Sequence, residues 1–200
     1  MKISSISGLL ISKSSGGVNM NYKPQIAIIG SRSLPENSLL LVEDISKALV
    51  DEGFRIVTGG IGTLQKAAQR GAKKSDKSGD GDTIAILPGF DPRPAVGYAD
   101  IIIPTGLDVL RNAIVANSDV VICVCGGSGT LSEIAFAWQL NRPILSIGGG
   151  GWSSNLAGVT IDHRFPDYKI VDCSDSSIDE VIDTVKRLNA ENRTRHAGIS

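Results

Sequence analysis

Two glycine-rich segments with the same pattern supply residues that could bind a ligand. Their sequences are GGIGTL at 59–64 and GGSGTL at 126–131, and each follows a short apolar run. Adjacent glycines permit a tight turn and leave main-chain N–H groups without partners where a helix begins. These groups and the positive end of the helix dipole favour a phosphate or another anion. The repeated pattern therefore predicts anion binding, although the need for two tight turns would also explain it.

The predicted binding residues are small or basic and follow apolar runs. Besides the two glycine segments, Gly30-Ser31-Arg32 ends such a run, and Arg32 could either contact an anion or be a solvated loop arginine. The predicted phosphate or ligand site comprises Gly30, Ser31, Arg32, Gly59, Gly60, Gly126, Gly127, Ser128, Gly129 and Thr130.

Arg111 and Glu133 are the candidate catalytic residues. Arg111 is expected early in a helix, where a cation opposes the helix dipole, so it should meet either an external anion or the carboxylate of Asp108. Glu133 could act on a sugar, but Thr130 to Glu133 also has the pattern of a capping box, in which the Glu bonds back to the helix start. Both interpretations of each residue remain open at this point.

No metal site is expected. Cys123 and Cys125 should face the same side of one strand, and no further ligands lie near them in the sequence. The phosphate-binding loop of ATPases and the dinucleotide fingerprint G-x-G-x-x-G are both absent from the sequence, which argues against ATP hydrolysis and against NAD or FAD. No cofactor is therefore required.

Short apolar runs alternate with helical patterns along the chain. The expected strands are 25–29, 55–58, 83–87, 101–103, 120–124 and 144–147, with an edge strand at 169–171. The expected helices run from 35 to about 52, from 63 to about 71, from 107 to 118, from 130 to about 140 and from 176 to 188, and 148–152 is expected to be a loop. This alternation predicts an α/β fold with a doubly wound, mainly parallel, Rossmann-like sheet covered by helices on both faces. Ligands of such sheets bind beyond the carboxyl ends of the strands, where the strand order reverses.

Composition is that of an ordinary globular protein. The chain has 200 residues, of which 42% are hydrophobic and 20% charged, and its net charge is −1. Nucleic-acid and membrane surfaces usually carry a basic excess, so neither partner is expected. Three cysteines, two of them in a predicted buried strand, favour a reducing compartment and hence a cytoplasmic location. We expect a disordered tail at 1–22, a single domain at 23–188 and a flexible tail at 189–200.

One ordered set of residues resembles a known superfamily. Arg111-Asn112, then Ser118-Asp119, then GGSGTLSE at 126–133 are similar to the superfamily of the cytokinin-activating phosphoribohydrolases (LOG proteins), long mislabelled as lysine decarboxylases, and the molybdenum-cofactor carrier proteins. The resemblance covers residues 25 to about 147. In the phosphoribohydrolase branch it implies that Gly126, Gly127, Gly129 and Thr130 hold a 5′-phosphate, that Glu133 handles the ribose and that Arg111 assists.

Two departures from that branch shift the functional expectation towards binding. Cys125 stands where the phosphoribohydrolases have a proline and Asn112 where they have a lysine, and both look closer to the molybdenum-cofactor carriers. The leading expectation is a protein that binds a phosphorylated, nucleotide-like small molecule at its Gly-Gly turns. The alternatives are a nucleoside 5′-monophosphate phosphoribohydrolase and a carrier of a molybdopterin-type ligand. Related proteins are commonly oligomers, so a homo-oligomer (dimer or tetramer) is expected, with contacts through the helices after Gly106 and Thr130.

Overall fold

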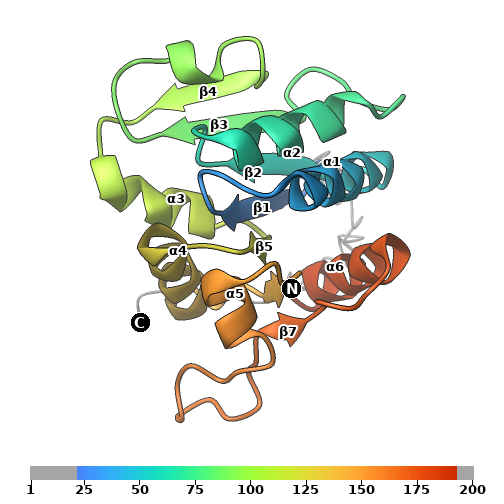
Figure 1. The fold of residues 1–200 in the computed structure, drawn as a ribbon, viewed down its shortest axis with the longest axis vertical. Coiled ribbons are helices and arrows are strands. Elements are labelled where there is room, and N and C mark those ends of the chain that lie inside the picture. The colour runs from blue at the N-terminus through green and yellow to red at the C-terminus, as the bar shows by residue number, and fades with distance from the viewer. Residues whose placement is uncertain (1–21, 193–200) are drawn as a thin grey trace, which may run out of the picture.

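The computed structural model describes residues 22–192, which form one parallel sheet with helices on both faces (Figure 1). Of the tails expected at 1–22 and 189–200, residues 1–21 and 193–200 lie outside the described part. The strands are β1 (Gln25–Gly30), β2 (Arg55–Thr58), β3 (Thr83–Leu87), β4 (Ile101–Pro104), β5 (Val120–Val124), β6 (Ile144–Ser146) and β7 (Val171–Asp172). The helices are α1 (Glu36–Asp51), α2 (Thr63–Lys73), α3 (Asn112–Ala116), α4 (Ser128–Gln139), α5 (Gly151–Leu156) and α6 (Ile178–Asn192), with short 3-10 helices η1 (Arg93–Ala95) and η2 (Asp108–Arg111).

The strand order reverses beside β1. The seven strands lie in the order β4-β3-β2-β1-β5-β6-β7, and all their pairings are parallel. The chain builds outward from β1 to β4 and then returns to place β5 on the other side of β1, in register from Ile26 opposite Val120 to Gly30 opposite Val124. The segments that follow β1 and β5 therefore diverge at one point on the carboxyl edge, where doubly wound sheets bind their ligands. This confirms the predicted fold class.

Alternate side chains of the central strands pack into two separate hydrophobic cores, one on each face of the sheet. Ile26 and Ile28 of β1 pack with α1, α2 and α6 on one face, whereas Ala27 and Ile29 pack with α3 and α4 on the other. All five residues of β5 are buried. Strands covered on both faces explain why the sequence shows continuous apolar runs at these positions rather than an alternating pattern.

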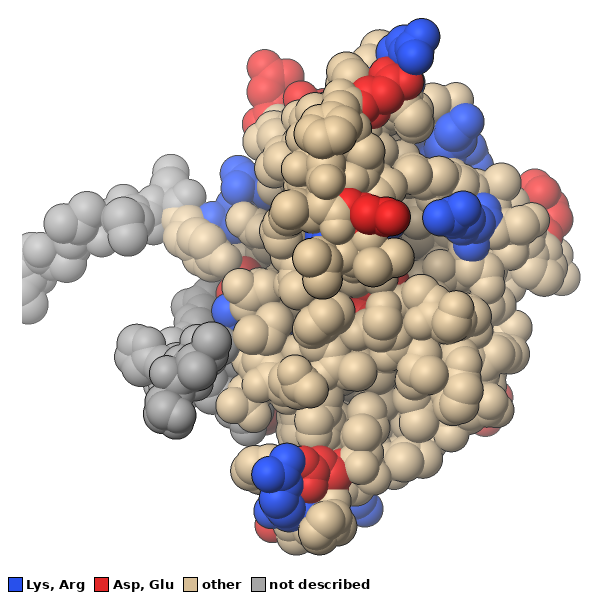
Figure 2. Space-filling model, turned by 90° about the vertical axis from the view of Figure 1, so that its left-hand side faces the viewer, with Lys and Arg blue, Asp and Glu red and all other residues tan. Residues whose placement is uncertain are grey.

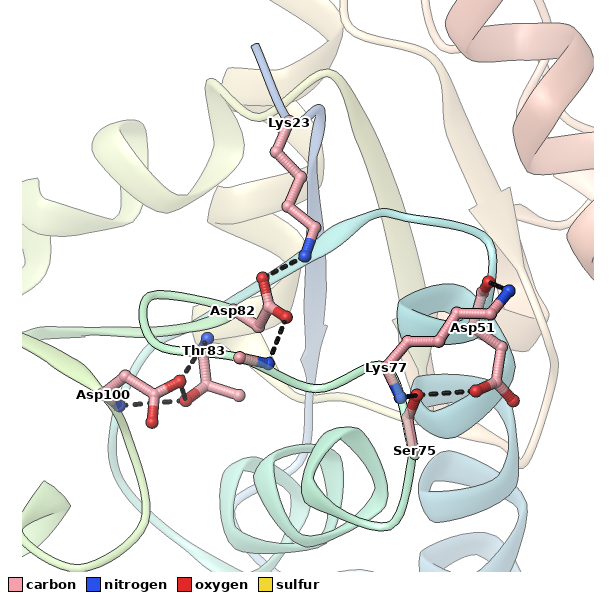
Figure 3. Close-up of polar contacts among 8 residues, drawn as sticks. Lys23, Asp51, Ser75, Lys77, Asp82, Thr83 and Asp100 are labelled. Carbon is pink, nitrogen blue, oxygen red and sulfur yellow. Dashed lines mark hydrogen bonds and ion pairs between the residues drawn. The ribbon is translucent and has the colours of Figure 1, made fainter. Parts of the chain in front are cut away.

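Polar side chains at the amino ends of the strands bond to one another (Figure 3). Asp82 accepts from Lys23 and from the N–H of Gly79, and Asp100 accepts from both the N–H and the hydroxyl of Thr83, at 3.0 and 2.8 Å. Ser75 at the end of α2 donates to Asp51 of α1 at 2.6 Å. Ser75 and Asp82 are buried, so the segment 73–82, which by composition should be a solvated loop, is held to α1 by Ser75 and to the residues before β1 by Asp82.

Several local expectations were wrong. The helix expected at 107–118 is divided into η2 and α3, and Asp108, the first residue of η2, has a left-handed backbone (φ 49°) and an N–H that bonds to Pro88 O. The loop expected at 148–152 contains the start of α5, and α6 continues past 188 to Asn192. α4 begins at Ser128 rather than Thr130, which changes the role available to Glu133.

Candidate functional site

A cavity of about 520 Å³ opens where the segments that follow β1 and β5 diverge. Its lining residues come from the segments after β1, β2, β3 and β5 and from η2 and the start of α3: Gly30, Ser31, Arg32, Ile61, Gln65, Pro88, Asp108, Val109, Arg111, Asn112, Gly127, Ser128, Gly129, Thr130 and Glu133. Figure 2 views the molecule from the side towards which β3 and β4 point in Figure 1, and most of that face carries uncharged side chains. Nine of the twelve candidate residues from the sequence lie in this one wall; Gly59, Gly60 and Gly126 do not.

The glycine loop, residues 126–129, presents main-chain donors to the cavity. Gly126 has φ 113°, a conformation that favours glycine, and a Cβ there would lie 2.5 Å from the side chain of Thr130. Its N–H donates to the hydroxyl of Ser31 at 3.0 Å, which joins the segments after β1 and β5. The N–H groups of the next four residues, 127–130, donate to no other group within residues 22–192. They stand at the start of α4, a position where unpaired N–H groups of proteins favour an anion.

Two arginines face the same cavity. Arg32 is exposed and makes no ion pair within residues 22–192. Arg111 is largely buried, and burial lowers the pKa of its guanidinium; the nearby charge of Arg32 acts in the same direction, whereas Glu133 opposes it. Two cations held near each other beside unpaired N–H groups create a positive potential that an anion would relieve.

Arg111 pairs with Glu133 inside the cavity. Arg111 Nη1 lies 3.1 Å from Glu133 Oε1, and both side chains are about nine-tenths buried. Burial raises the pKa of Glu133 to about 7, against the opposing effect of Arg111. The two local contacts that the sequence also allowed do not occur within residues 22–192. Glu133 lies inside α4 beyond its first turn and does not cap the helix, and Asp108 forms no ion pair with Arg111.

The first glycine segment, residues 59–64, packs against residues that line the cavity. A Cβ on Gly59 would lie 2.5 Å from Arg111 Nη1, so the guanidinium rests directly on this glycine. A Cβ on Gly60 would meet the side chain of Leu87 at 2.5 Å. The two GG-x-GTL segments thus differ in use, because one supplies donors and the other makes room for an arginine.

Two carboxamides in the cavity had no role assigned from sequence. Asn112 donates to the Ser132 hydroxyl at 2.8 Å, and that hydroxyl donates to Gly129 O at 2.7 Å, so Asn112 braces the glycine loop. Gln65, in the first turn of α2, lines the cavity and is buried. The position of Gln65 directly after the first GG-x-GTL segment was the available signal.

Comparison with known proteins identifies the family. The model of the SLOG cluster4 family matches residues 23–176. The chain belongs to this family. An uncharacterized protein from Archaeoglobus fulgidus is 33% identical over 124 residues, which cover 62% of this chain and 79% of that protein.

Solved structures similar to this SLOG cluster4 chain include two proteins that are described as binding or carrying the molybdenum cofactor (Moco). The molybdenum cofactor binding protein from Rippkaea orientalis is 30% identical (TM-score 0.69; 84% of this chain and 98% of that one covered). The Moco carrier protein from Chlamydomonas reinhardtii is 27% identical (TM-score 0.67; 85% and 99% covered). DNA processing protein A from Helicobacter pylori, described by a single-stranded DNA binding mode, is 19% identical (TM-score 0.60; 82% and 80% covered), which shows the fold alone.

Three further observations concern the described part of this SLOG cluster4 chain. Within residues 22–192, no helix is both long and apolar enough to cross a bilayer, and no three His, Cys, Asp or Glu side chains gather as metal ligands. Cys123 and Cys125 belong to opposite cores, contrary to the expectation that they share one face, because Cys125 leaves the strand with φ 55°.

Proposed function

We propose that this chain binds a phosphorylated, nucleotide-like small molecule in the cavity beyond the carboxyl ends of β1 and β5. One observation carries the proposal: the unpaired N–H groups of residues 127–130, Arg32 and Arg111 all lie in a single wall. Unpaired donors at a helix start, together with guanidinium groups, match the oxygens of a phosphate. The rest of the cavity, which includes Ile61, Pro88 and Val109, offers apolar surface for the remainder of such a ligand.

Unpaired polar atoms of cavity residues support this assignment. Sheltered side-chain atoms without a hydrogen bond in residues 22–192 are Arg55 Nε, Gln65 Oε1 and Arg111 Nε, and the last two belong to cavity residues. Buried polar groups are normally paired, so unpaired groups that line a cavity are available to a ligand.

The phosphate requirement is tested directly with adenosine 5′-monophosphate (AMP) and adenosine. We expect calorimetric titration to detect AMP binding with an affinity at least about tenfold above that of adenosine, because only the phosphate reaches the charged and main-chain donors. Ribose 5-phosphate should retain part of the affinity. Equal binding of AMP and adenosine, or binding of neither, would contradict the proposal.

Binding should also tighten as the pH falls through neutrality. The pKa of Glu133 is raised to about 7, so above that pH its carboxylate repels a phosphate and neutralises Arg111, whereas below it the protonated side chain does neither. Ligand binding then takes up a proton, and affinity should increase as pH falls from about 8 to about 6, by at most a factor of about ten per pH unit.

The variant Glu133→Gln is the matched control for this pH dependence. Titration of the phosphate itself is common to both proteins, so the difference between their affinity profiles isolates Glu133. The variant should lose the increase near neutrality and bind more tightly than the wild type at high pH. Identical profiles would show that Glu133 does not titrate in contact with the ligand.

The similar solved structures favour a second candidate, carriage of a molybdopterin-type ligand, because two of them are described as binding or carrying a molybdenum cofactor. Such a ligand also combines a phosphate with a nitrogen heterocycle, so the same wall would serve it. Mass spectrometry of small molecules released from the purified protein on denaturation, with fluorescence as a second readout for pterins, distinguishes the two. A released nucleotide would exclude this candidate.

Hydrolysis of a nucleoside monophosphate is a third candidate, and the position of Glu133 favours it. Cleavage of a base-sugar bond develops positive charge on the sugar, which a carboxylate can stabilise. Incubation with AMP should then release adenine, and Glu133→Gln should abolish the release; AMP bound without release of base would leave a binding protein. Self-association and a cytoplasmic location stay predictions.

A further inference from the structure

We infer that Gln65 recognises the ring edge of the ligand, specifically an amino group beside a ring nitrogen. The inference rests on the proposed function, because it assumes that a phosphorylated ligand occupies the same cavity. It names the chemical class of the rest of the ligand, which the phosphate-binding residues do not contact.

Gln65 is buried without a partner. Its side chain lines the cavity from the first turn of α2, and the residue is 7% exposed. Oε1 is sheltered from solvent and accepts no hydrogen bond, and Nε2 donates none to any group in residues 22–192. An unsatisfied buried amide costs on the order of 1–3 kcal/mol, so a bound group that satisfies it gains a corresponding advantage.

The neighbouring polar groups are already committed to one another. Gln69, one turn further along α2, donates to Thr58 Oγ1 at 3.4 Å, and the same oxygen accepts the N–H of Gly60 at 3.3 Å. Across the cavity, Arg111 is paired with Glu133. Two glutamines on one helix therefore differ: Gln69 bonds to Thr58, whereas Gln65 lines the cavity and makes no hydrogen bond within residues 22–192.

The chemistry of a carboxamide specifies what it can bind. It presents one acceptor and two donors in a single plane, which match an acceptor and a donor placed side by side on a ligand. An amino group next to a ring nitrogen, as in adenine, has this arrangement, and glutamine pairs with adenine through two hydrogen bonds in other contexts. A phosphate offers acceptors only and would leave Oε1 unpaired. Gln65 therefore fits a heterocycle rather than the anion.

The surrounding surface fits the faces of such a ring. Ile61, Pro88 and Val109 line the same cavity, and they provide apolar contacts that the glycine loop and the two arginines do not. Binding sites for small molecules commonly combine apolar surface with a few polar groups that fix orientation. Gln65 is the unpaired carboxamide available for that purpose, since Asn112 holds Ser132.

The test compares three phosphorylated probes on three proteins. AMP carries the amino group, purine riboside 5′-monophosphate lacks only that group, and ribose 5-phosphate lacks the ring. In the wild type we expect AMP to bind more tightly than purine riboside 5′-monophosphate by on the order of tenfold. Gln65→Met, which keeps the volume and removes the amide, should abolish this preference and leave the affinity for ribose 5-phosphate unchanged.

Gln69→Met is the matched control, because it makes the same change one turn away on the same helix, outside the cavity lining. It should keep the preference for AMP even where its melting temperature is lower. If Gln65→Met does not fold, Gln65→Leu, which also removes the amide and adds no charge, should abolish the preference for AMP in the same way. An unchanged preference in the Gln65 variants, or no preference in a wild type that binds ribose 5-phosphate, would overturn the inference alone. A wild type that binds none of the three probes would overturn the proposed function with it.

Discussion

Replacing Gly30 by alanine is expected to lower the free energy of unfolding by about 3 kcal/mol or more, a large part of the 5–15 kcal/mol that stabilises a typical domain. A Cβ at Gly30 would lie 2.1 Å from Val124 O and 2.6 Å from Leu64 Cδ1. The first contact is with main chain, and Gly30 stands opposite Val124 in the central β1–β5 pairing, so neither strand can move without breaking the sheet there. Urea denaturation measures the loss.

Gly89→Ala provides the control for this substitution. Gly89 is exposed, its backbone is not left-handed, and a Cβ there would meet nothing within 4 Å. It should change the free energy of unfolding by no more than about 0.5 kcal/mol. Similar stabilities for the two variants would mean that β1 and β5 do not approach as closely as the structure has them.

Arg111→Leu is expected to reduce the affinity for AMP by about tenfold to about a hundredfold. Hydrogen bonds from a charged donor contribute about 1.5–3 kcal/mol, and Arg111 is the buried cation of the cavity wall. Its loss also removes the group that opposes the effect of burial on the pKa of Glu133, so the carboxyl group should be protonated at neutral pH. The change in affinity is measured by calorimetry at neutral pH.

Arg142→Leu separates this local effect from a change in net charge. Arg142 lies outside the cavity lining and donates from Nε to Asn117 Oδ1 at 2.9 Å. It carries the same charge and receives the same substitution, yet it should bind AMP as the wild type does. A similar loss of affinity in both variants would indicate a general electrostatic effect and would contradict a direct contact between Arg111 and the phosphate.

Sequence was sufficient for the fold because the signals that determine it are local. Continuous apolar runs such as 120–124 identify strands covered on both faces, and glycines after them mark the turns into helices. The rule that ligands bind where strand order reverses then placed Gly30, Ser31 and Arg32 in the same wall as the glycine loop, although β1 and β5 are far apart in the chain. Nine of the twelve candidate residues line the cavity for this reason.

The pairing of side chains could not be predicted from sequence. Arg111 and Glu133 have local partners in the sequence, Asp108 and the start of α4, and both local interpretations were physically reasonable. The structure selects the long-range pair because Asp108 adopts φ 49° and α4 begins two residues earlier than expected. Gln65 was overlooked for a related reason: its isolation depends on how Gln69 and Thr58 bond, which only the packed structure determines.

The bond from the Gly126 N–H to the Ser31 hydroxyl joins the two halves of the sheet at the mouth of the cavity. A molecule that touches both the segment after β1 and the start of α4 would span the same boundary from outside. A bound ligand would then hold the two halves of the sheet together, so the free energy of unfolding would rise with the logarithm of free ligand concentration. In cells that lack this small molecule the protein would be less stable, and its abundance would follow the supply of its ligand.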